Sequence, residues 1–441
     1  KLARATVTSI SGYDDFSKEQ SQDIDASPNV AADNFTFNDV QNFSQEIRLA
    51  SDDSFRNRWL IGANYAHTKI NWFQTIDLTD LAGIPTSNGA DQTTKVWAAF
   101  GQLVVPFADH FEFVGGLRYT KEKRDWTGAT FVGKFPNLAA ALASGAPTLS
   151  QLPLPASDPR AGGPLDFPTS LDKGKVDYQA VFKYRPSDDS MYYLSASEAF
   201  RSGGYSSAVI FSQDALEPYK PEVLRAYEIG TKLKFPGAKL RFSVAAFYYD
   251  YKDFQATFIR GTEANARLQN AGDVKIQGGE AMLDWEPTER WSVNLGVSVL
   301  DTEIVKTNVV LPPLDGGPAT TIKRNEIPNA PKFTLNGKLR YALPIGSNYV
   351  AALQTDFTSV SSHFLEPNNR KVLQENGYFL VNGRVSFAPR DGGPWQVSAW
   401  VKNASDEEYK AAAQDIMLAL GFAEIVNGLP RTWGVDFEYR F

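Results

Sequence analysis

Apolar and polar residues alternate along many short segments of this sequence, and that alternation limits the fold more than any other feature. At the carboxyl end, TWGVDFEYRF places Trp433, Val435, Phe437, Tyr439 and Phe441 on one parity. Three of the four residues between them are charged. A β-strand turns successive side chains to opposite faces, so this segment predicts a strand with one apolar and one polar face.

The alternation recurs along the chain, and the repetition carries more weight than any one match. The clearest further examples are FTLNGKLRYAL (333–343), WSVNLGVSV (291–299), FLVNGRVSF (379–387) and YEIGTKLKF (227–235). Weaker versions are WLIGANY, FEFVGGLRY, YQAVFKY and WQVSAWV. Together they predict an all-β, antiparallel protein with about sixteen strands in this chain.

The connections between the predicted strands alternate between short and long. Short turns rich in Pro, Gly and Asp lie at 185–190, 235–239, 286–290, 343–348 and 388–394. Long connections are predicted at 14–40, 72–94, 122–172, 199–222, 255–272, 304–331, 361–376 and 410–428. Two short helices are predicted inside them, at 138–144 and 411–420. An up-and-down barrel in a membrane has short turns at one rim and long loops at the other, which explains this sorting.

The composition of the strands favours a membrane barrel. Many predicted strands begin or end with an aromatic residue, as the aromatic girdles of outer-membrane barrels require. The apolar face of the last strand is then expected to meet hydrocarbon, while Asp436, Glu438 and Arg440 point into a wet lumen. Backbone groups in lipid must all be hydrogen-bonded, so such a sheet has to close. The alternative is a large soluble β-protein whose apolar faces pack on a protein core.

Several functional classes lack support in the residues. The chain has no cysteine and three distant histidines, and its lysines and arginines are dispersed. No motif for nucleotide binding, hydrolysis or zinc or calcium binding is present. We therefore expect no enzymatic activity, no cofactor, no protein-bound metal and no nucleic-acid partner.

A few side chains in the predicted long loops are candidates for ligand contact. Arg201 in FRSGGYSS could reach an anionic ligand, and Tyr205 could offer a stacking surface. The alternative reading of that segment is structural, because its two glycines would let a strand bend at the rim. Arg260 and Arg267 could line an outer vestibule or belong to scattered surface charge. His363 falls in the predicted 361–376 loop and is a further candidate, although a packing histidine is the ordinary reading.

Seven segments resemble TonB-dependent outer-membrane receptors, which are active transporters of Gram-negative bacteria. They occur in the family's order and cover most of the chain: FSQEIRLAS with WLIGANY, SEAFRSGGYS, YKPEVLRAYEIGTKLKF, NAGDVKIQGGEAMLDWEP, NAPKFTLNGKLRYALP, VNGRVSFAP with VSAWVKNASDEEY, and GLPRTWGVDFEYRF. The resemblance implies import of a scarce, bulky substrate such as a ferric siderophore, cobalamin, haem or an oligosaccharide.

The resemblance also implies a domain organisation and partners. Residues 1–441 would be the carboxyl-terminal part of a 22-stranded, plugged barrel, with short periplasmic turns and extracellular loops. The plug domain, the TonB box and the first strands would lie outside this chain. Expected partners are outer-membrane lipid and lipopolysaccharide, the TonB energy-coupling complex, and the barrel-assembly machinery, which would recognise the terminal Phe441. The alternatives are a passive porin of sixteen strands and a soluble β-rich binding or structural protein.

Overall fold

The protein forms one large antiparallel sheet in a computed structural model that describes residues 4–23, 30, 33–145, 169–206, 218–260, 265–311, 313, 318–417 and 422–441. Sixteen strands lie side by side in the order β1-β2-β3-β4-β5-β6-β7-β8-β9-β10-β11-β14-β15-β16-β17-β20. Each strand pairs with the next strand of the sheet in antiparallel register. The predicted up-and-down topology and the predicted number of strands are confirmed.

The first half of the sheet contains the longest strands. Its elements are β1 (Ala5–Asp23), β2 (Asp33–Ser51), β3 (Arg58–Leu78), α1 (Thr79–Ala82), β4 (Ile84–Phe107), β5 (Phe111–Val132), α2 (Leu138–Ala143), β6 (Ser170–Ser187), β7 (Ser190–Arg201) and β8 (Glu222–Phe235).

The second half continues the sheet and adds two small hairpins. Its elements are η3 (Pro236–Ala238), β9 (Leu240–Arg260), β10 (Asn265–Trp285), β11 (Trp291–Lys306), β12 (Val310–Leu311), β13 (Thr320–Thr321), β14 (Phe333–Ile345), β15 (Tyr349–Phe364), η5 (Lys371–Leu373), β16 (Gln374–Pro389), β17 (Trp395–Lys402), β18 (Lys410–Ile416), β19 (Phe422–Asn427) and β20 (Thr432–Tyr439).

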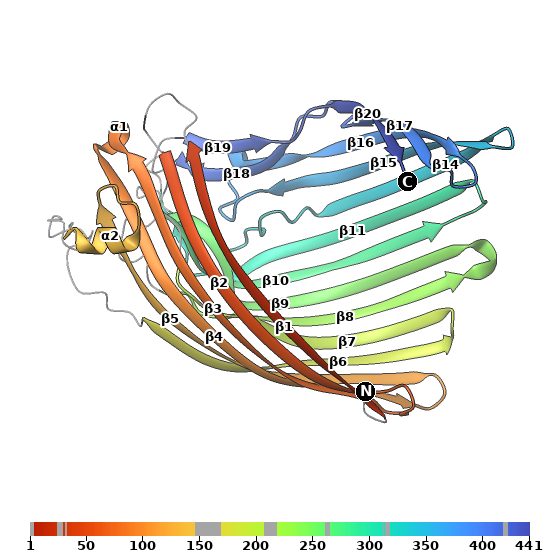
Figure 1. Ribbon diagram of the computed structural model, residues 1–441, viewed down its shortest axis with the longest axis horizontal. Coiled ribbons are helices and arrows are strands. Elements are labelled where there is room, and N and C mark those ends of the chain that lie inside the picture. The colour runs from red at the N-terminus through yellow and green to blue at the C-terminus, as the bar shows by residue number, and fades with distance from the viewer. Residues whose placement is uncertain are drawn as a thin grey trace.

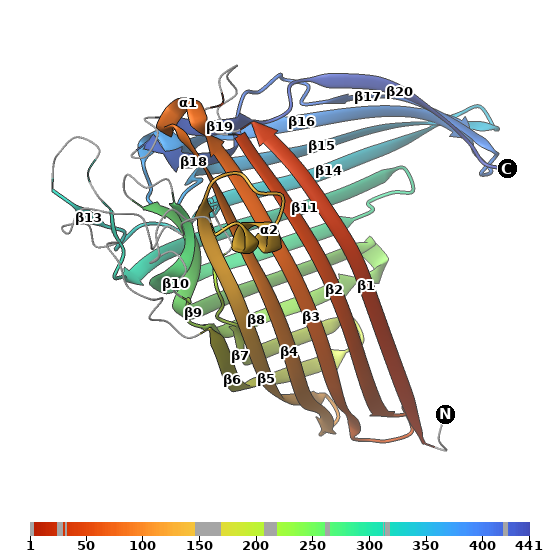
Figure 2. The ribbon, with the colours of Figure 1, turned by 60° about the vertical axis from the view of Figure 1, so that its left-hand side comes forward.

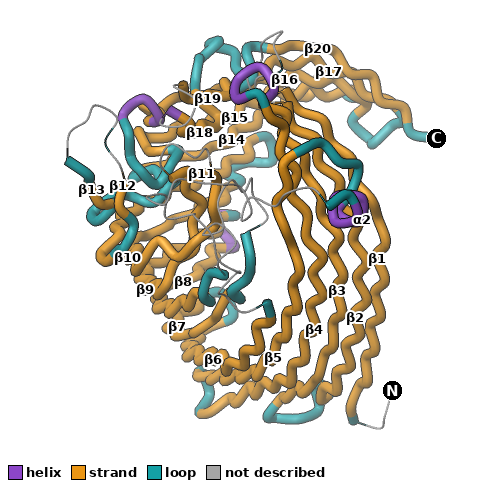
Figure 3. The backbone as a smooth tube through the Cα atoms, turned by 90° about the vertical axis from the view of Figure 1, so that its left-hand side faces the viewer, coloured by secondary structure: helices purple, strands orange, loops and turns teal. Residues whose placement is uncertain are grey.

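The sheet curls into a trough in which β1–β5 face the later strands (Figures 1, 2 and 3). Within the described part of the chain, the two edge strands β1 and β20 are not paired with each other. No helix among those residues is long and apolar enough to cross a membrane. The predicted tight turns all lie at one end of the strands, and the predicted long connections lie at the other end, where some of them prove to be shorter than predicted.

One face of the sheet is apolar and solvent-accessible across the whole width. We call it the outer face. The strand register places Ile61, Leu117, Leu194, Ile229 and Leu353 on this face, and their exposed fractions lie between 53% and 63%. A soluble core would bury such residues, so the exposed large side chains mark contact with a non-aqueous partner. The opposite face, the inner face, carries most of the charged residues.

The apolar stretch of the outer face has nearly the same length on many strands. It runs over about nine residues on β5 (Phe111–Tyr119), β6 (Val176–Tyr184), β8 (Tyr227–Phe235) and β11 (Trp291–Val299). A tilted membrane strand needs about 9–11 residues to cross the hydrocarbon. The outer face therefore matches a lipid-facing band of bilayer thickness.

Aromatic side chains border this apolar band at both ends. At the short-turn end, Phe111 stacks on Tyr184 with ring centroids 4.7 Å apart, and Trp291 lies 4.8 Å from Tyr341. At the other border, Tyr65 lies 4.4 Å from Trp97. These are the two girdles expected at the membrane interfaces.

Several strands extend far beyond the band, and here the sequence analysis was wrong. The predicted connections 14–40, 72–94 and 255–272 are mostly strand, because only 24–32, 79–83 and 261–264 separate the paired strands. Asp14 and Asp15, for example, lie within β1. Beyond the band neither face meets lipid, and apolar residues are no longer confined to one face, so the apolar–polar alternation that predicts a strand disappears.

A six-residue helix covers the outer face of this extension. Asn137 caps α2 by accepting a hydrogen bond from the backbone N–H of Ala140 at 2.8 Å. Leu138 and Ala141 of α2 pack on Phe73 and Phe131, which are 3% and 2% exposed. This confirms the helix predicted at 138–144. The apolar contact lies above the lipid-facing band, where a protein element rather than lipid covers it.

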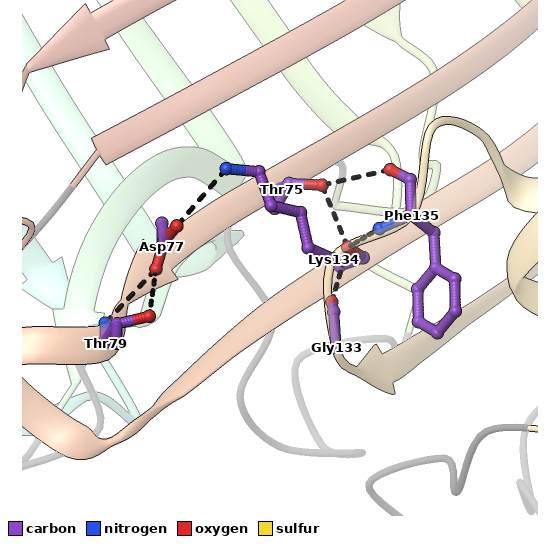
Figure 4. Close-up of polar contacts among 7 residues, drawn as sticks. Thr75, Asp77, Thr79, Gly133, Lys134 and Phe135 are labelled. Atoms are coloured by element: carbon purple, nitrogen blue, oxygen red, sulfur yellow. Dashed lines mark hydrogen bonds and ion pairs between the residues drawn. The ribbon is translucent and has the colours of Figure 1, made fainter.

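Hydrogen bonds tie the segment before α2 to the strands beneath it (Figure 4). The Ser87 hydroxyl lies 2.9 Å from the Thr75 hydroxyl and donates to the Gly133 carbonyl at 2.8 Å. Lys134 Nζ lies 3.3 Å from Asp77 Oδ2. Hydrogen bonds from Thr79 and then Lys134 hold the pKa of Asp77 below its ordinary value.

The other predicted helix, 411–420, is wrong for residues 411–416. Residues 410–416 form β18, which pairs with β19 in a two-stranded sheet at the long-loop end. Pairing with β19 gives hydrogen-bond partners to the backbone of this alanine-rich segment. A helix of this length would leave many of its backbone N–H and C=O groups without a partner. Residues 418–420 lie outside the described residues.

Candidate functional site

Polar side chains of β5 form a ledge on the inner face at the long-loop end, beside two of the candidate residues, Arg201 and Tyr205. Glu122, Arg124 and Trp126 alternate along this part of β5 and share the inner face. Arg124 Nη2 lies 2.8 Å from Glu122 Oε1, and both side chains are less than one-fifth exposed. A partly buried ion pair of this kind fixes its neighbours more firmly than an exposed pair does.

The connection between β7 and β8 folds back onto this ledge. The Ser202 hydroxyl donates to Glu122 Oε2 at 2.8 Å. Gly204 and Tyr219 form an isolated antiparallel bridge, with N–H to O distances of 3.1 and 2.8 Å. The Gln255 side-chain amide donates to the carbonyls of Ser202 and Lys220 at 3.0 Å. Both ends of the connection are therefore anchored on the inner wall.

Close packing at this anchor requires the first glycine of FRSGGYSS, Gly203, because backbone atoms surround it, whereas the atoms next to Gly204 belong to side chains. A Cβ on Gly203 would lie 2.4 Å from the Tyr219 carbonyl oxygen and 3.0 Å from the Pro221 nitrogen. A Cβ on Gly204 would lie 2.2 Å from Arg124 Nη1. The structural reading of this segment thus has a specific cause at Gly203, which is the close approach of another backbone segment rather than strand bending.

Tyr205 enters the lumen beside this anchor. Its ring stacks on Trp126 with centroids 4.8 Å apart and an interplanar angle of 16°. Trp72 of β3 and Ala90 of β4 complete the cluster, in which Tyr205 is 6% exposed. The ring therefore stacks on protein, and a ligand would reach it only after the connection moved.

The predicted cations occupy different environments. Arg201 is the last residue of β7; its side chain is 62% exposed, and Nη1 lies 3.9 Å from Glu222 Oε1. Arg267 lies on β10 and is 9% exposed. Arg260 ends β9, and its side chain lies outside the described residues. Arg201 ends β7 where the anchored connection begins, and Tyr205 lies on that connection. Arg267 lies beside it on β10, because the backbone N–H of its neighbour Leu268 donates to the Ser206 hydroxyl at 3.3 Å.

His363 lies within β15 rather than in a loop. It is 7% exposed, and its Nδ1 lies 3.0 Å from the Ser361 carbonyl oxygen. Its cross-strand neighbour is Glu375 of β16. This placement is that of a packing histidine at the long-loop end, and its contact with a ligand remains a prediction.

Three long connections are joined into one latch near His363. Asp415 of β18 accepts a hydrogen bond from the Asn368 side-chain amide at 2.6 Å. The same carboxylate forms an ion pair with Arg370, whose Nε lies 3.1 Å away. Asn369 accepts a hydrogen bond from the Glu326 backbone N–H at 2.7 Å. The connections β11–β14, β15–β16 and β17–β20 therefore form a shared cap, which we call the latch.

The latch contains an acid with a displaced pKa. Burial, followed by the nearby Asp415 carboxylate, raises the pKa of Glu366 from 4.5 to about 7. When the latch opens, the group returns toward its ordinary value, so the closed state holds the proton between about pH 4.5 and 7 while the open state releases it.

We therefore expect the latch to be most stable below about pH 4.5 and to weaken progressively up to about pH 7, by at most roughly 3 kcal/mol. Amide hydrogen exchange of residues 365–373, corrected for the intrinsic pH dependence, should rise across this window. Glu366→Gln should remove the dependence. An exchange rate that stays flat in the wild type contradicts the assignment.

The inner face also carries charge nearer the short-turn end. Glu112 lies 3.0 Å from Arg58, 2.9 Å from Lys183 and 3.5 Å from Arg185, beside an open cavity of about 460 Å³. Further along, the Tyr193 hydroxyl donates to Glu228 at 2.5 Å. Sequence reasoning missed these groups, although the parity of their strands already placed them on the polar face.

Phe441 is fully exposed at the short-turn end, and its ring lies 5.2 Å from that of Tyr439. Among the described residues, no group of three or more His, Asp or Glu side chains is placed to hold a metal ion. The inner face therefore offers surfaces for binding and anchored loops. Several of its acidic and basic side chains are paired with each other.

Comparison with known proteins places the chain within one family. Residues 3–404 match the family described as TonB dependent receptor-like, beta-barrel. The pesticin receptor of Yersinia pestis is 20% identical over 333 residues, which are 75% of this chain and 42% of the receptor. The probable TonB-dependent siderophore receptor PiuA of Acinetobacter baumannii is 28% identical over 163 residues, 36% of this chain and 21% of PiuA.

A solved structure shows the same fold. The ferric yersiniabactin uptake receptor FyuA of Yersinia pestis superposes with a TM-score of 0.77 at 17% identity, over 100% of this chain and 60% of FyuA. The chain therefore spans about three-fifths of the length of this receptor.

Proposed function

Because the chain belongs to the family of TonB-dependent receptors, we propose that it forms the substrate-binding wall of an outer-membrane active transporter. The observation that supports this most is the apolar band of about nine residues on the outer face, combined with a charged inner face. Such a wall separates lipid from water. Transport would proceed by binding and rearrangement, without bond chemistry, in the outer membrane of a Gram-negative bacterium.

We propose that residues 1–441 are the carboxyl-terminal portion of a larger barrel. Sixteen paired strands with two unpaired edges within the described residues, and the coverage of only 60% of FyuA, support this. The remaining strands of a 22-stranded barrel would join the edges of β1 and β20. A plug domain carrying the TonB box would occupy the trough, where the inner-face carboxylates and cations would contact it.

We propose a ferric siderophore as the substrate. Two of the relatives support this, because PiuA is described as a probable siderophore receptor and FyuA as a ferric yersiniabactin uptake receptor. The exposed guanidinium of Arg201 at the long-loop end would attract an anionic chelate. Cobalamin, haem and oligosaccharides are the other substrate classes to be tested.

The proposed partners follow from this location. The TonB complex would act through the plug, and the barrel-assembly machinery would recognise the exposed Phe441. Outer-membrane lipid and lipopolysaccharide would surround the apolar band.

Uptake by a deletion strain tests the proposed function. Cells lacking the gene are complemented with the full-length receptor and supplied with ⁵⁵Fe bound to catecholate, hydroxamate or carboxylate chelators. We expect uptake of one class to depend on the receptor and on TonB. Receptor-dependent entry that persists without TonB would indicate a passive porin, and uptake of cobalamin, haem or oligosaccharide alone would overturn the siderophore assignment.

A further inference from the structure

A small cavity lies where β6 and β7 part at the long-loop end. The two strands are paired only as far as Tyr178 and Glu198. Beyond this point β6 stays paired with β5, and β7 stays paired with β8 as far as Arg201 and Glu222. The space between the parted strands, bordered by the β5 ledge and the β7–β8 connection, is a cavity of about 130 Å³. We call this cavity the slot.

The walls of the slot are held in place by backbone contacts. Gly203 lines it, and the bridge between Gly204 and Tyr219 fixes the connection beside it. The backbone N–H of Lys220 donates to the Asn270 side chain at 2.7 Å. Five residues give the slot an apolar and aromatic lining: Leu171, Phe200, Pro218, Tyr219 and Pro221. A ligand that enters walls already ordered in this way avoids the cost of ordering them.

The size and lining of the slot limit what can enter it. An apolar cavity of about 150 Å³ accepts one benzene molecule, so a slot of about 130 Å³ has room for one six-membered ring and not for two. Walls of proline and aromatic side chains favour a flat aromatic ring over a hydrated carboxylate, whose burial is costly. The slot therefore fits a single aryl group.

Two exposed lysines also line the slot. They are Lys173 and Lys220, and within the described part of the chain neither forms an ion pair. Lys173 lies directly opposite Glu122 in the register. Both carboxylate oxygens of Glu122 are nevertheless engaged, one by Arg124 and the other by Ser202. Because lysine keeps its ammonium group in water while its stem lies on apolar surface, the two free charges belong at the mouth of the slot.

The inner face around the slot carries a net positive charge. At this depth the ledge, β6 and the two ends of the connection carry four cations and two carboxylates, which are Arg124, Lys173, Arg201, Lys220, Glu122 and Glu222. Four against two leaves an excess of two positive charges. Nearer the apolar band the charges occur as neighbours of opposite sign, which are Lys175 with Glu198 and Arg118 with Asp177. Asp125 and Asp172 lie on the outer face and pair with lysines there.

We propose that the slot binds one catecholate arm of a ferric siderophore. The far edge of the ring enters the slot, so the ring oxygens and the iron that they hold stay at the mouth. There the negative charge of the oxygens faces Lys173 and Lys220. Hydroxamate and carboxylate chelates have no ring to place between the apolar walls. This inference rests on the proposed function and names the class of siderophore within it.

Isothermal titration calorimetry on the full-length receptor, purified in mild detergent, tests the charge at the mouth. The two probes carry ferric ion in a hexadentate tricatecholate chelator and in a hexadentate trihydroxamate chelator. We expect the wild type to bind the tricatecholate about tenfold more tightly than the trihydroxamate, and Lys173→Gln/Lys220→Gln to lose about tenfold in tricatecholate affinity. Lys175→Gln is the matched control on the same strand and should keep wild-type affinity, because Glu198 already neutralises that lysine.

A second variant tests the slot itself. Leu171→Phe fills the slot without changing its charge and should also weaken tricatecholate binding about tenfold. Unchanged protease resistance of the β7–β8 connection shows that the anchor is intact in each variant. Wild-type tricatecholate affinity in either variant, or a wild type that prefers the trihydroxamate, would overturn the proposal while leaving siderophore transport in place. A wild type that binds neither chelate and imports neither into cells would overturn the siderophore assignment itself.

Discussion

Arginine in place of Leu117 is expected to reduce the amount of folded receptor in the outer membrane at least tenfold. Leu117 is 63% exposed on the outer face of β5, inside the apolar band that runs from Phe111 to Tyr119. A cation near the bilayer midplane on the lipid face of a barrel costs about 2–4 kcal/mol, and each 1.4 kcal/mol is a factor of ten in the folding equilibrium. Heat-modifiable migration and urea unfolding in lipid vesicles measure the loss.

Arginine in place of Gln179 is the matched control. Gln179 pairs with Gly116, the neighbour of Leu117, so it lies at the same depth on the inner face. It is also exposed, and its replacement should leave the amount of folded receptor close to wild type. Equal losses in the two variants would mean that the two faces do not meet different solvents.

The second large effect is expected from Gly203→Val. Its side chain would meet backbone atoms of Tyr219, Lys220 and Pro221, which cannot rotate away. The bridge between Gly204 and Tyr219 should therefore break, and with it the placement of Tyr205 on Trp126. We expect uptake to fall at least tenfold with little change in the amount of folded receptor, because the clash lies outside the membrane band.

The measurements are ⁵⁵Fe uptake and proteolysis of the β7–β8 connection in intact cells. Gly296→Ala is the control, because a Cβ there meets no other atom within 4 Å. Wild-type uptake and unchanged protease resistance in Gly203→Val would show that the anchor is dispensable.

Much of the fold could be predicted because the bilayer imposes a simple pattern. Within the apolar band, every second residue of TWGVDFEYRF or YEIGTKLKF faces lipid and must be apolar, so the strand can be recognised from the sequence. Beyond the band that constraint ends, so the extensions of β1, β3 and β9 read as loops. The segment 411–416 read as a helix for the same reason, since pairing with β19 rather than local propensity determines its conformation.

The candidate site was predictable only in part. The unusual FRSGGYSS segment identified Arg201, which ends β7, and Tyr205, which lies on the β7–β8 connection that folds onto the inner wall. Its partners Glu122, Trp126 and Trp72 could not be found, because they come from strands far away in sequence and carry no local motif. His363 shows the converse: its position in a predicted loop suggested ligand access, whereas the structure buries it within β15.

The most direct test of the lipid-facing wall is a single-cysteine scan of residues 227–235 on β8. The chain has no cysteine of its own, so each spin label reports one position in the full-length receptor reconstituted in vesicles. We predict high accessibility to membrane-dissolved oxygen at Tyr227, Ile229, Thr231, Leu233 and Phe235. Labels at Glu228, Gly230, Lys232 and Lys234 should instead respond to a water-soluble nickel complex. Accessibility without this two-residue period, or odd positions shielded from both reagents, would contradict a wall with lipid on one side and water on the other.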